Sequence, residues 1–159
     1  MPGPIELVQV QGDEQVAVAR ELFREYAGAI GVDLEYQGFA AELASLHAPY
    51  VPPHGALIVA QVDCATAACV ALRCLDEATG EMKRLFVRPA YRSLGLGQCL
   101  IEAVVKAARG AGYTALRLDT LPSMAGAQAL YRKLGFVEIP AYNTTHLPGT
   151  RFFELELGA

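Results

Sequence analysis

A short glycine-bearing stretch is the part of this chain whose residue types and spacing most directly suggest chemistry. Gly95 and Gly97 follow Arg92 in the pattern R-x-x-G-x-G, just after an apolar run that ends at Val87. The first N–H groups of a helix have no partner within the helix, and the helix dipole adds positive charge at that end. A loop whose glycines let a ligand approach these groups is a site for phosphate or pyrophosphate.

The pattern differs from two common nucleotide-binding loops. The dinucleotide fingerprint G-x-G-x-x-G would need a third glycine where this chain has Leu100, and no Gly-Lys-Ser/Thr follows, as the phosphate loop of nucleotide hydrolases requires. For two glycines on their own, an ordinary strand-to-helix turn stays open as an alternative.

Two longer motifs resemble those of one enzyme superfamily, the GNAT acyltransferases. The loop at residues 92–97, preceded by V-x-P-x-Y (Val87, Pro89, Tyr91), is similar to the family's acyl-coenzyme A loop. The segment L-Y-x-x-L-G-F at residues 130–136 is similar to a second family signature. The resemblance covers essentially the whole chain and implies a single N-acetyltransferase domain over residues 1–159. It also implies acetyl-coenzyme A as the cofactor, with coenzyme A as the product.

The reaction that the resemblance implies is direct attack of an amine on the acetyl thioester. An alkyl amine of pKa about 10.4 is almost fully protonated at neutral pH, so a base near the amine would help. Glu81 is the first candidate base, because related acetyltransferases often carry a catalytic glutamate at this strand position. Asp119, at the end of the next strand, is a rival, and a chain of water is a third possibility. Tyr131 of the second motif is the candidate acid for the departing thiolate.

Each catalytic candidate has a structural alternative. Glu81 could be a solvated carboxylate at the start of its strand, beside Lys83. Asp119 could cap the loop before the last helix. The ring of Tyr131 could belong to the core, which is compatible with a working hydroxyl.

The coenzyme is expected to contact the chain in two places. The strand backbone at residues 85–87 should pair with the pantetheine arm like an added strand, and the N–H of Phe86 or Val87 should serve as the oxyanion donor. Many family members have asparagine seven residues before the tyrosine; here that position is Met124, which leaves Ser123 as the candidate substitute. The predicted cofactor-binding residues are Leu85, Phe86, Val87, Arg92, Ser93, Leu94, Gly95, Leu96, Gly97, Gln98, Ser123 and Tyr131.

The acceptor site in this fold usually comes from the first two helices and the segment after the last helix. Tyr36, Phe39 and Tyr142 are therefore the predicted substrate-binding residues, although the aromatic rings could also close the core. The expected acceptor is the primary amine of a small molecule. A protein or peptide acceptor, and a non-catalytic sensor of acyl-coenzyme A, remain alternatives.

Composition excludes several other classes. The chain has 159 residues, 53% of them hydrophobic, with a formal net charge of −4. An acidic balance gives no basic footprint for nucleic acid, and no apolar run is long enough to span a membrane. We expect a cytoplasmic protein without a metal, which could form a homodimer as similar proteins often do. The four cysteines are expected to be buried apolar side chains.

Apolar periodicity predicts an α/β (α+β) fold with a mixed central sheet of about seven strands, in the order β-α-α-β-β-β-α-β-α-β-β, which is also the GNAT order. The strands are predicted at residues 5–10, 56–62, 67–75, 81–87, 115–119, 137–139 and 151–157. The helices are predicted at residues 14–31, 39–46, 98–109 and 125–134, with a proline-rich loop at 47–55. Ideal strand alternation predicts that one face of the fourth strand carries Glu81, Lys83, Leu85 and Val87, and a bulge in the strand is the alternative that would change this.

Overall fold

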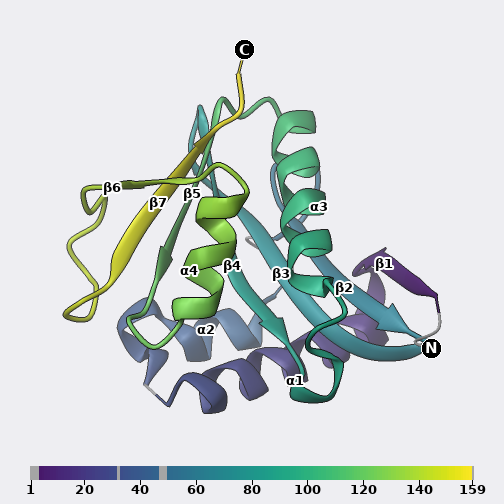
Figure 1. Cartoon of the computed structure of the whole chain (residues 1–159). Coiled ribbons are helices and arrows are strands. Elements are labelled where there is room, and N and C mark those ends of the chain that lie inside the picture. Colours follow the sequence, from purple (N-terminus) through teal and green to yellow (C-terminus); the bar gives the residue numbers. More distant parts are fainter. Residues whose placement is uncertain (1–3, 32, 47–49, 159) are drawn as a thin grey trace.

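The computed structural model describes residues 4–31, 33–46 and 50–158, and these form a seven-stranded mixed sheet in the order β1-β2-β3-β4-β5-β7-β6 (Figure 1). The strands are β1 Ile5–Gln9, β2 Ala56–Val62, β3 Ala65–Asp76, β4 Thr79–Val87, β5 Ala115–Thr120, β6 Val137–Ile139 and β7 Arg151–Glu156. The helices are α1 Gly12–Ile30, α2 Phe39–Ala44, α3 Leu96–Gly110 and α4 Ala125–Lys133, with short 3₁₀ turns η1 Leu34–Gln37 and η2 Pro89–Tyr91.

Helices cover both faces of the sheet, with α3 and α4 on one side and α1 and α2 on the other (Figure 1). Each side has its own hydrophobic cluster. The cluster under α3 and α4 includes Leu100, Val104 and Tyr131, all almost fully buried. The cluster under α1 includes Leu22 and Phe23, which are fully buried. The apolar sides of α1, α3 and α4 therefore face the sheet, as in an amphipathic helix.

The expected order of elements is confirmed, with differences at the ends. Helix α3 begins two residues earlier than predicted, at Leu96, because Gly95 caps it in the left-handed region at φ +79°. The stretch predicted to be without regular structure before α2 forms η1, where the Asp33 carboxylate accepts from the Glu35 N–H. The predicted second helix ends at Ala44 rather than Leu46. Part of the predicted proline-rich loop, residues 47–49, lies outside the described residues.

Strands β4 and β5 are parallel but pair over only three residues. Thr79–Glu81 of β4 pairs with Ala115–Arg117 of β5, and the pairing stops there although both strands continue. Beyond this point two residues of β4, Arg84 and Leu85, lie opposite a single residue of β3, which makes a β-bulge. Arg84 has φ +60°, an unusual conformation for a residue other than glycine. The bulge bends β4 where the two strands part.

The bulge also breaks the predicted side-chain alternation. Leu85 and Val87 pack against the cluster under α3, which holds Met82 as well, whereas Phe86 belongs to the cluster under α1. In a regular strand Met82 and Leu85 would lie on opposite faces. The prediction that Glu81, Lys83, Leu85 and Val87 share one face is therefore wrong beyond Arg84.

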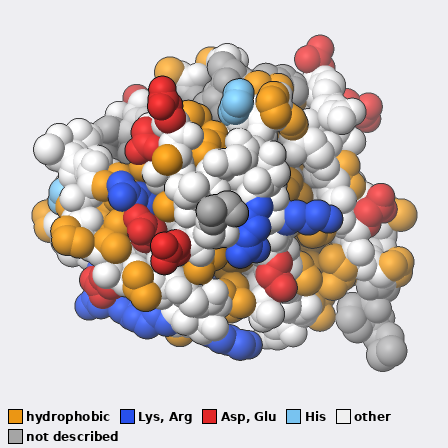
Figure 2. Space-filling view, turned by 90° about the horizontal axis from the view of Figure 1, so that it is seen from above, with side chains coloured by type: hydrophobic (Ala, Val, Ile, Leu, Met, Phe, Trp, Pro, Cys, Tyr) orange, Lys and Arg blue, Asp and Glu red, His pale blue; other side chains and the backbone are white. Residues whose placement is uncertain are grey.

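The surface and the cysteines complete the description. Acidic and basic side chains are interspersed on the face shown in Figure 2. Among the described residues no helix is long and apolar enough to cross a membrane. All four cysteines are free thiols. Cys69 is buried as predicted and Cys99 is half-buried, but Cys64 and Cys74 are exposed, so the prediction is wrong for those two.

Candidate active site

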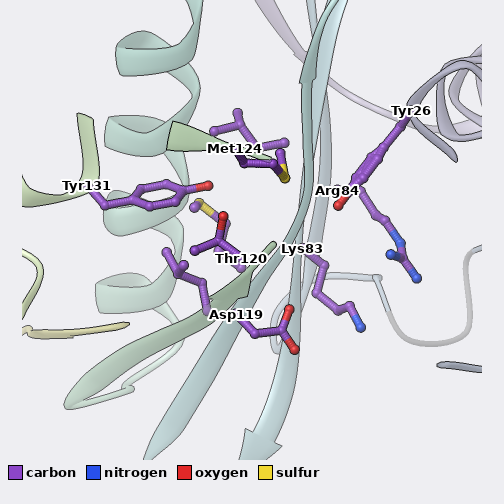
Figure 3. Close-up of a pocket in the computed structure, with 10 residues that line it drawn as sticks. Tyr26, Lys83, Arg84, Asp119, Thr120, Met124 and Tyr131 are labelled. Carbon is purple, nitrogen blue, oxygen red and sulfur yellow. The ribbon is translucent and has the colours of Figure 1, made fainter. Parts of the chain in front are cut away.

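A narrow cavity lies where β4 and β5 part. Its volume is about 20 Å³, enough for one or two water-sized groups. Figure 3 shows the Tyr131 side chain reaching in from α4 on one side and Tyr26 and Arg84 lying on the other. The lining residues are Tyr26, Met82, Lys83, Arg84, Leu85, Leu118, Asp119, Thr120, Met124 and Tyr131.

Asp119 brings a carboxylate to this cavity from the end of β5. The side chain is half-buried. Burial raises the pKa of Asp119 above its ordinary value, and the charge of Glu81 adds to this, while Lys83, Arg84 and a hydrogen bond from Asn143 oppose it. A carboxyl group whose pKa is raised is a stronger base than an ordinary aspartate.

Lys83 lies beside Asp119, with both side chains extending the same way in Figure 3. Burial lowers the pKa of Lys83, and the charge of Arg84 lowers it further, while Glu81 and Asp119 oppose the change. Neither Lys83 nor Asp119 forms an ion pair within 4.0 Å with any residue that the structure describes. Pairs of groups with opposed shifts in pKa are typical of catalytic and binding sites.

Tyr131 has both of the roles that the sequence left open, because its ring belongs to the core and its hydroxyl is available at the site. The residue is only 4% exposed, and its ring packs against Phe136 and Phe153, with centroids 5.7 and 6.0 Å away. Its hydroxyl nevertheless points into the cavity (Figure 3). Burial raises the pKa of Tyr131 well above its ordinary value, and Tyr26 and Asp119 act in the same direction. The hydroxyl therefore stays protonated at neutral pH and is available as a donor.

Glu81, the first candidate base, is 3% exposed and has both carboxylate oxygens occupied. Arg73 Nε donates to Oε1 at 2.6 Å, and the Tyr142 hydroxyl donates to Oε2 at 2.6 Å. The alternative of a solvated carboxylate at the strand start is therefore wrong. Glu81 is also absent from the cavity lining. Its contacts tie β3 and the segment before β7 to the point where β4 and β5 part.

Arg84 is a residue of this site that sequence reasoning missed. Its guanidinium is 2% exposed and binds Glu42 of α2 with two contacts, Nη2–Oε1 at 2.7 Å and Nε–Oε2 at 3.0 Å. It also lies over the rings of Tyr26 and Phe39, 5.7 and 5.2 Å from their centroids. Tyr50 donates a further hydrogen bond to Glu42 at 2.9 Å. The one available signal was the adjacent pair Lys83 and Arg84, because consecutive residues of a strand face opposite sides of the sheet and one of the two charges must therefore face the protein interior.

The predicted acceptor residues lie in different surroundings. Phe39 starts α2 and stacks under Arg84. The ring of Tyr142 packs edge-on against Phe152 at 5.1 Å, and its hydroxyl serves Glu81. The side chain of Tyr36 lies outside the described part of the chain. The structure thus brings Tyr142 into contact with Glu81, one of the catalytic candidates, and places Phe39 against the Arg84 guanidinium.

The predicted phosphate loop leads from η2 into α3. Ser93 and Gly95 both have positive φ, +73° and +79°, so the backbone turns sharply before the helix begins. A Cβ at Gly95 would meet no atom within 4 Å, whereas one at Gly97 would lie 3.3 Å from Leu130 of α4. Gly95 therefore leaves the N-terminus of α3 open to a ligand, whereas the missing side chain of Gly97 lets α3 pack closely against α4. Arg92 is exposed and its Nε donates to the Val87 carbonyl at 3.1 Å.

The chain matches known acetyltransferases along its length. A family model described as the acetyltransferase (GNAT) domain matches residues 53–138, more than half of the chain. An N-acetyltransferase of Schizosaccharomyces pombe is 34% identical over 158 residues, which cover 98% of this chain and 97% of that protein.

Two solved structures share the fold. A GNAT-family acetyltransferase of Staphylococcus aureus has a TM-score of 0.79 at 21% identity, covering 97% of this chain and 99% of its own. An acetyltransferase of Salmonella typhimurium, solved with acetyl-coenzyme A, has a TM-score of 0.69 at 16% identity, covering 99% and 96%. The chain therefore belongs to the GNAT acetyltransferase family. It is an acetyl-coenzyme A-dependent N-acetyltransferase.

The residues present fit this cofactor. The N-terminus of α3 is open at Gly95, as an anion site requires. The Thr120 hydroxyl is buried in the cavity wall and has no hydrogen-bond partner among the described residues. A polar group of a ligand in the cavity could supply that hydrogen bond. Met124, at the position where many relatives carry asparagine, lines the cavity, whereas its proposed substitute Ser123 is exposed.

Proposed function

We propose that this enzyme acetylates the primary amine of a small molecule by direct attack on the thioester, with Asp119 as the base and Tyr131 as the acid. The observation that carries the proposal is that both side chains enter one cavity, from β5 and from α4, at the point where β4 and β5 part. Glu81 is the weaker candidate base, because Arg73 and Tyr142 already occupy its carboxylate.

Asp119 would take a proton from the bound amine, which is largely protonated in water at neutral pH. The raised pKa of Asp119 narrows the difference in pKa between the amine and the carboxyl group. The Asp119 carboxylate has a hydrogen bond from Asn143 but no ion pair within 4.0 Å among the described residues. General-base assistance of this kind contributes about 100-fold to 10,000-fold to a rate.

Tyr131 would hold a proton where negative charge develops on the leaving group. The apolar packing of its ring fixes the direction of the hydroxyl, which lowers the cost of orienting it during the reaction. Acetyl-coenzyme A, when bound, supplies the activated acyl group. We assign its backbone contacts to β4 at Leu85, Phe86 and Val87, where pairing with β5 has ended, and its phosphate contacts to residues 92–98.

A small acceptor suits the shape of the site. The cavity of about 20 Å³ holds only one or two waters by itself, so the support for a small acceptor comes from the groups that border it. Tyr142, anchored to Glu81, borders the site from the segment between β6 and β7, and the Arg84–Glu42 pair closes it toward α2. A slender amine enters such a site more readily than a folded protein surface.

Calorimetric titration with acetyl-coenzyme A, followed by a thiol-release assay with small amines and lysine-bearing peptides, tests the proposal. Thiol release with small amines but not with peptides is the expected result. Release with peptides alone would contradict the small-molecule acceptor.

Gly95→Val tests the phosphate loop, with Gly12→Val as the matched control. Both glycines have positive φ, +79° and +77°, and neither Cβ would meet a neighbour within 4 Å, so the strain is similar. Coenzyme affinity should fall only in Gly95→Val. Equal affinities in the two variants would contradict the loop assignment.

A further inference from the structure

The charged groups around the cavity can be separated into those with partners and those without. Arg84 is paired with Glu42, and Arg73 with Glu81, each by contacts of 2.6–2.7 Å. Two opposite charges are left, the ammonium of Lys83 and the carboxylate of Asp119. Neither has an ion-pair partner among the described residues, and Asp119 accepts a hydrogen bond only from the neutral side chain of Asn143. Lys83 and Asp119 both line the same cavity.

A charge held in a half-buried site without a partner is costly unless something pairs with it. Lys83 and Asp119 interact electrostatically but do not form a direct ion pair. In Figure 3 the charged ends of the two side chains lie on the same side of the site, away from the Tyr131 hydroxyl. A ligand with one positive and one negative group, separated by a few bonds, would satisfy both at once.

We propose that the acceptor is an amino acid: Asp119 binds its ammonium group and Lys83 binds its carboxylate. This inference rests on the proposed function and deepens it by naming the substrate class. The negatively charged group that Lys83 binds in this proposal belongs to the acceptor rather than to the coenzyme. The thioester end of the coenzyme is uncharged, and its phosphates are assigned to the N-terminus of α3, beyond the end of β4.

The transfer balances for such a substrate. A nitrogen–carbon bond forms at the amine and the carbon–sulfur bond of the thioester breaks. Of the two protons that the ammonium group loses, one ends on the coenzyme sulfur and the other leaves through Asp119 to solvent. The carboxylate is unchanged, so Lys83 keeps its partner throughout and acts in binding rather than in the chemical step.

Matched pairs of acceptors test the proposal. We would compare α-, β- and γ-amino acids with their carboxamides, which keep the amine and lose the negative charge. In the wild type, kcat/KM for the preferred acid should exceed that for its amide by about 10-fold to 100-fold, the range of a charge-assisted hydrogen bond. Titration of the same pairs into the complex with coenzyme A should show the same preference in binding affinity.

Lys83→Met should abolish the preference for the acid, mainly through KM, and leave acetyl-coenzyme A affinity unchanged. The readout is the ratio of kcat/KM for the acid to kcat/KM for its amide within each variant, because the charge of Lys83 also lowers the pKa of Asp119 and its removal alters absolute turnover. Lys83→Arg should retain much of the preference. Lys106→Met is the control, because it removes an equal charge from an exposed position on α3.

Each other outcome is decisive. Turnover of plain amines or amides without a preference for acids would overturn this inference and leave the proposed function standing. A preference for acids that survives in Lys83→Met would also overturn it. Coenzyme binding without turnover of any small amine, acid or amide would reject both proposals.

Discussion

Three acidic side chains approach the active site, and they differ in whether the protein already satisfies them. Glu81 is almost fully buried and the side chain of Glu42 is 10% exposed, and each is held by an arginine and a tyrosine. Asp119 is half-buried and lies beside Lys83 without an ion pair. A buried carboxylate with all its partners supports the fold, whereas one left open to a cavity is available for a ligand.

Replacement of Asp119 should have the largest effect of this comparison. Asp119→Asn removes the proposed base, and we expect turnover to fall by about 100-fold to 10,000-fold. Because folding raises the pKa of Asp119, the ionised carboxylate destabilises the folded state at any pH above its ordinary pKa. Its loss should therefore leave thermal stability unchanged or slightly higher. Steady-state kinetics and a melting curve on the same sample measure both; normal turnover would show that Asp119 is not the base.

Replacement of Glu42 should act on stability in the opposite way. Glu42→Gln leaves the Arg84 guanidinium buried without a counter-charge, which costs about 3 kcal/mol or more of unfolding free energy. Urea denaturation measures the loss. A double replacement with Arg84→Met is the control, because it removes both charges and should recover much of the stability. A small loss in Glu42→Gln alone would mean that the pair is far weaker than its burial indicates.

The Glu42–Arg84 pair also predicts how stability depends on pH. Burial acts to raise the pKa of Glu42, but the hydrogen bonds and charge of Arg84 outweigh it, so the net pKa lies below its ordinary value of 4.5. The contribution of Glu42 is therefore complete above about pH 4.5 and is lost as pH falls through the lowered pKa. In denaturation curves measured from pH 6 to pH 3, the difference in unfolding free energy between wild type and Glu42→Gln should shrink toward zero at the acid end. A constant difference across this range would contradict the assignment.

Much of the fold, and part of this site, could be predicted from the sequence. Apolar periodicity locates the helices and strands, and the glycine loop and Tyr131 follow from local motifs. The pairing of charges could not be predicted, because it depends on contacts between distant elements. Arg84 reaches Glu42, 42 positions earlier, only because the bulge in β4 turns its side chain toward α2. Regular alternation contains no such turn.

The same dependence on distant contacts explains why the sequence could not decide between Glu81 and Asp119 as the base. Glu81 and Asp119 look alike in sequence, each an acid on a strand next to the predicted cofactor site. Their difference comes from Tyr142, which reaches Glu81 across 61 positions of the chain. Only the three-dimensional arrangement shows that Glu81 has an arginine and a tyrosine on its two oxygens, whereas Asp119 has a hydrogen bond from Asn143 and no ion pair among the described residues.

Replacement of Glu81 should therefore behave as a moderate stability change. Glu81→Gln weakens the contact with Arg73, which is 39% exposed and so partly screened, and we expect a loss of about 1–2 kcal/mol. Turnover by the remaining folded enzyme should stay within about threefold, an effect below 1 kcal/mol. Tyr142→Phe is the matched control, since it removes the other hydrogen bond to the same carboxylate. A drop in turnover as large as that of Asp119→Asn would make Glu81 the base after all.

The smallest predicted effect concerns the neighbour of Asp119 on β5. Thr120 is 3% exposed, and its hydroxyl has no hydrogen-bond partner among the described residues. Thr120→Val keeps the branched shape and removes the unsatisfied group, so the free protein should become more stable by about 1 kcal/mol. Thr120→Ser, which retains a hydroxyl, should not gain in this way. If the hydroxyl instead has a partner in the free enzyme, Thr120→Val will lose stability. In that case Asp119 and Lys83, but not Thr120, would remain available to bind a ligand in the cavity.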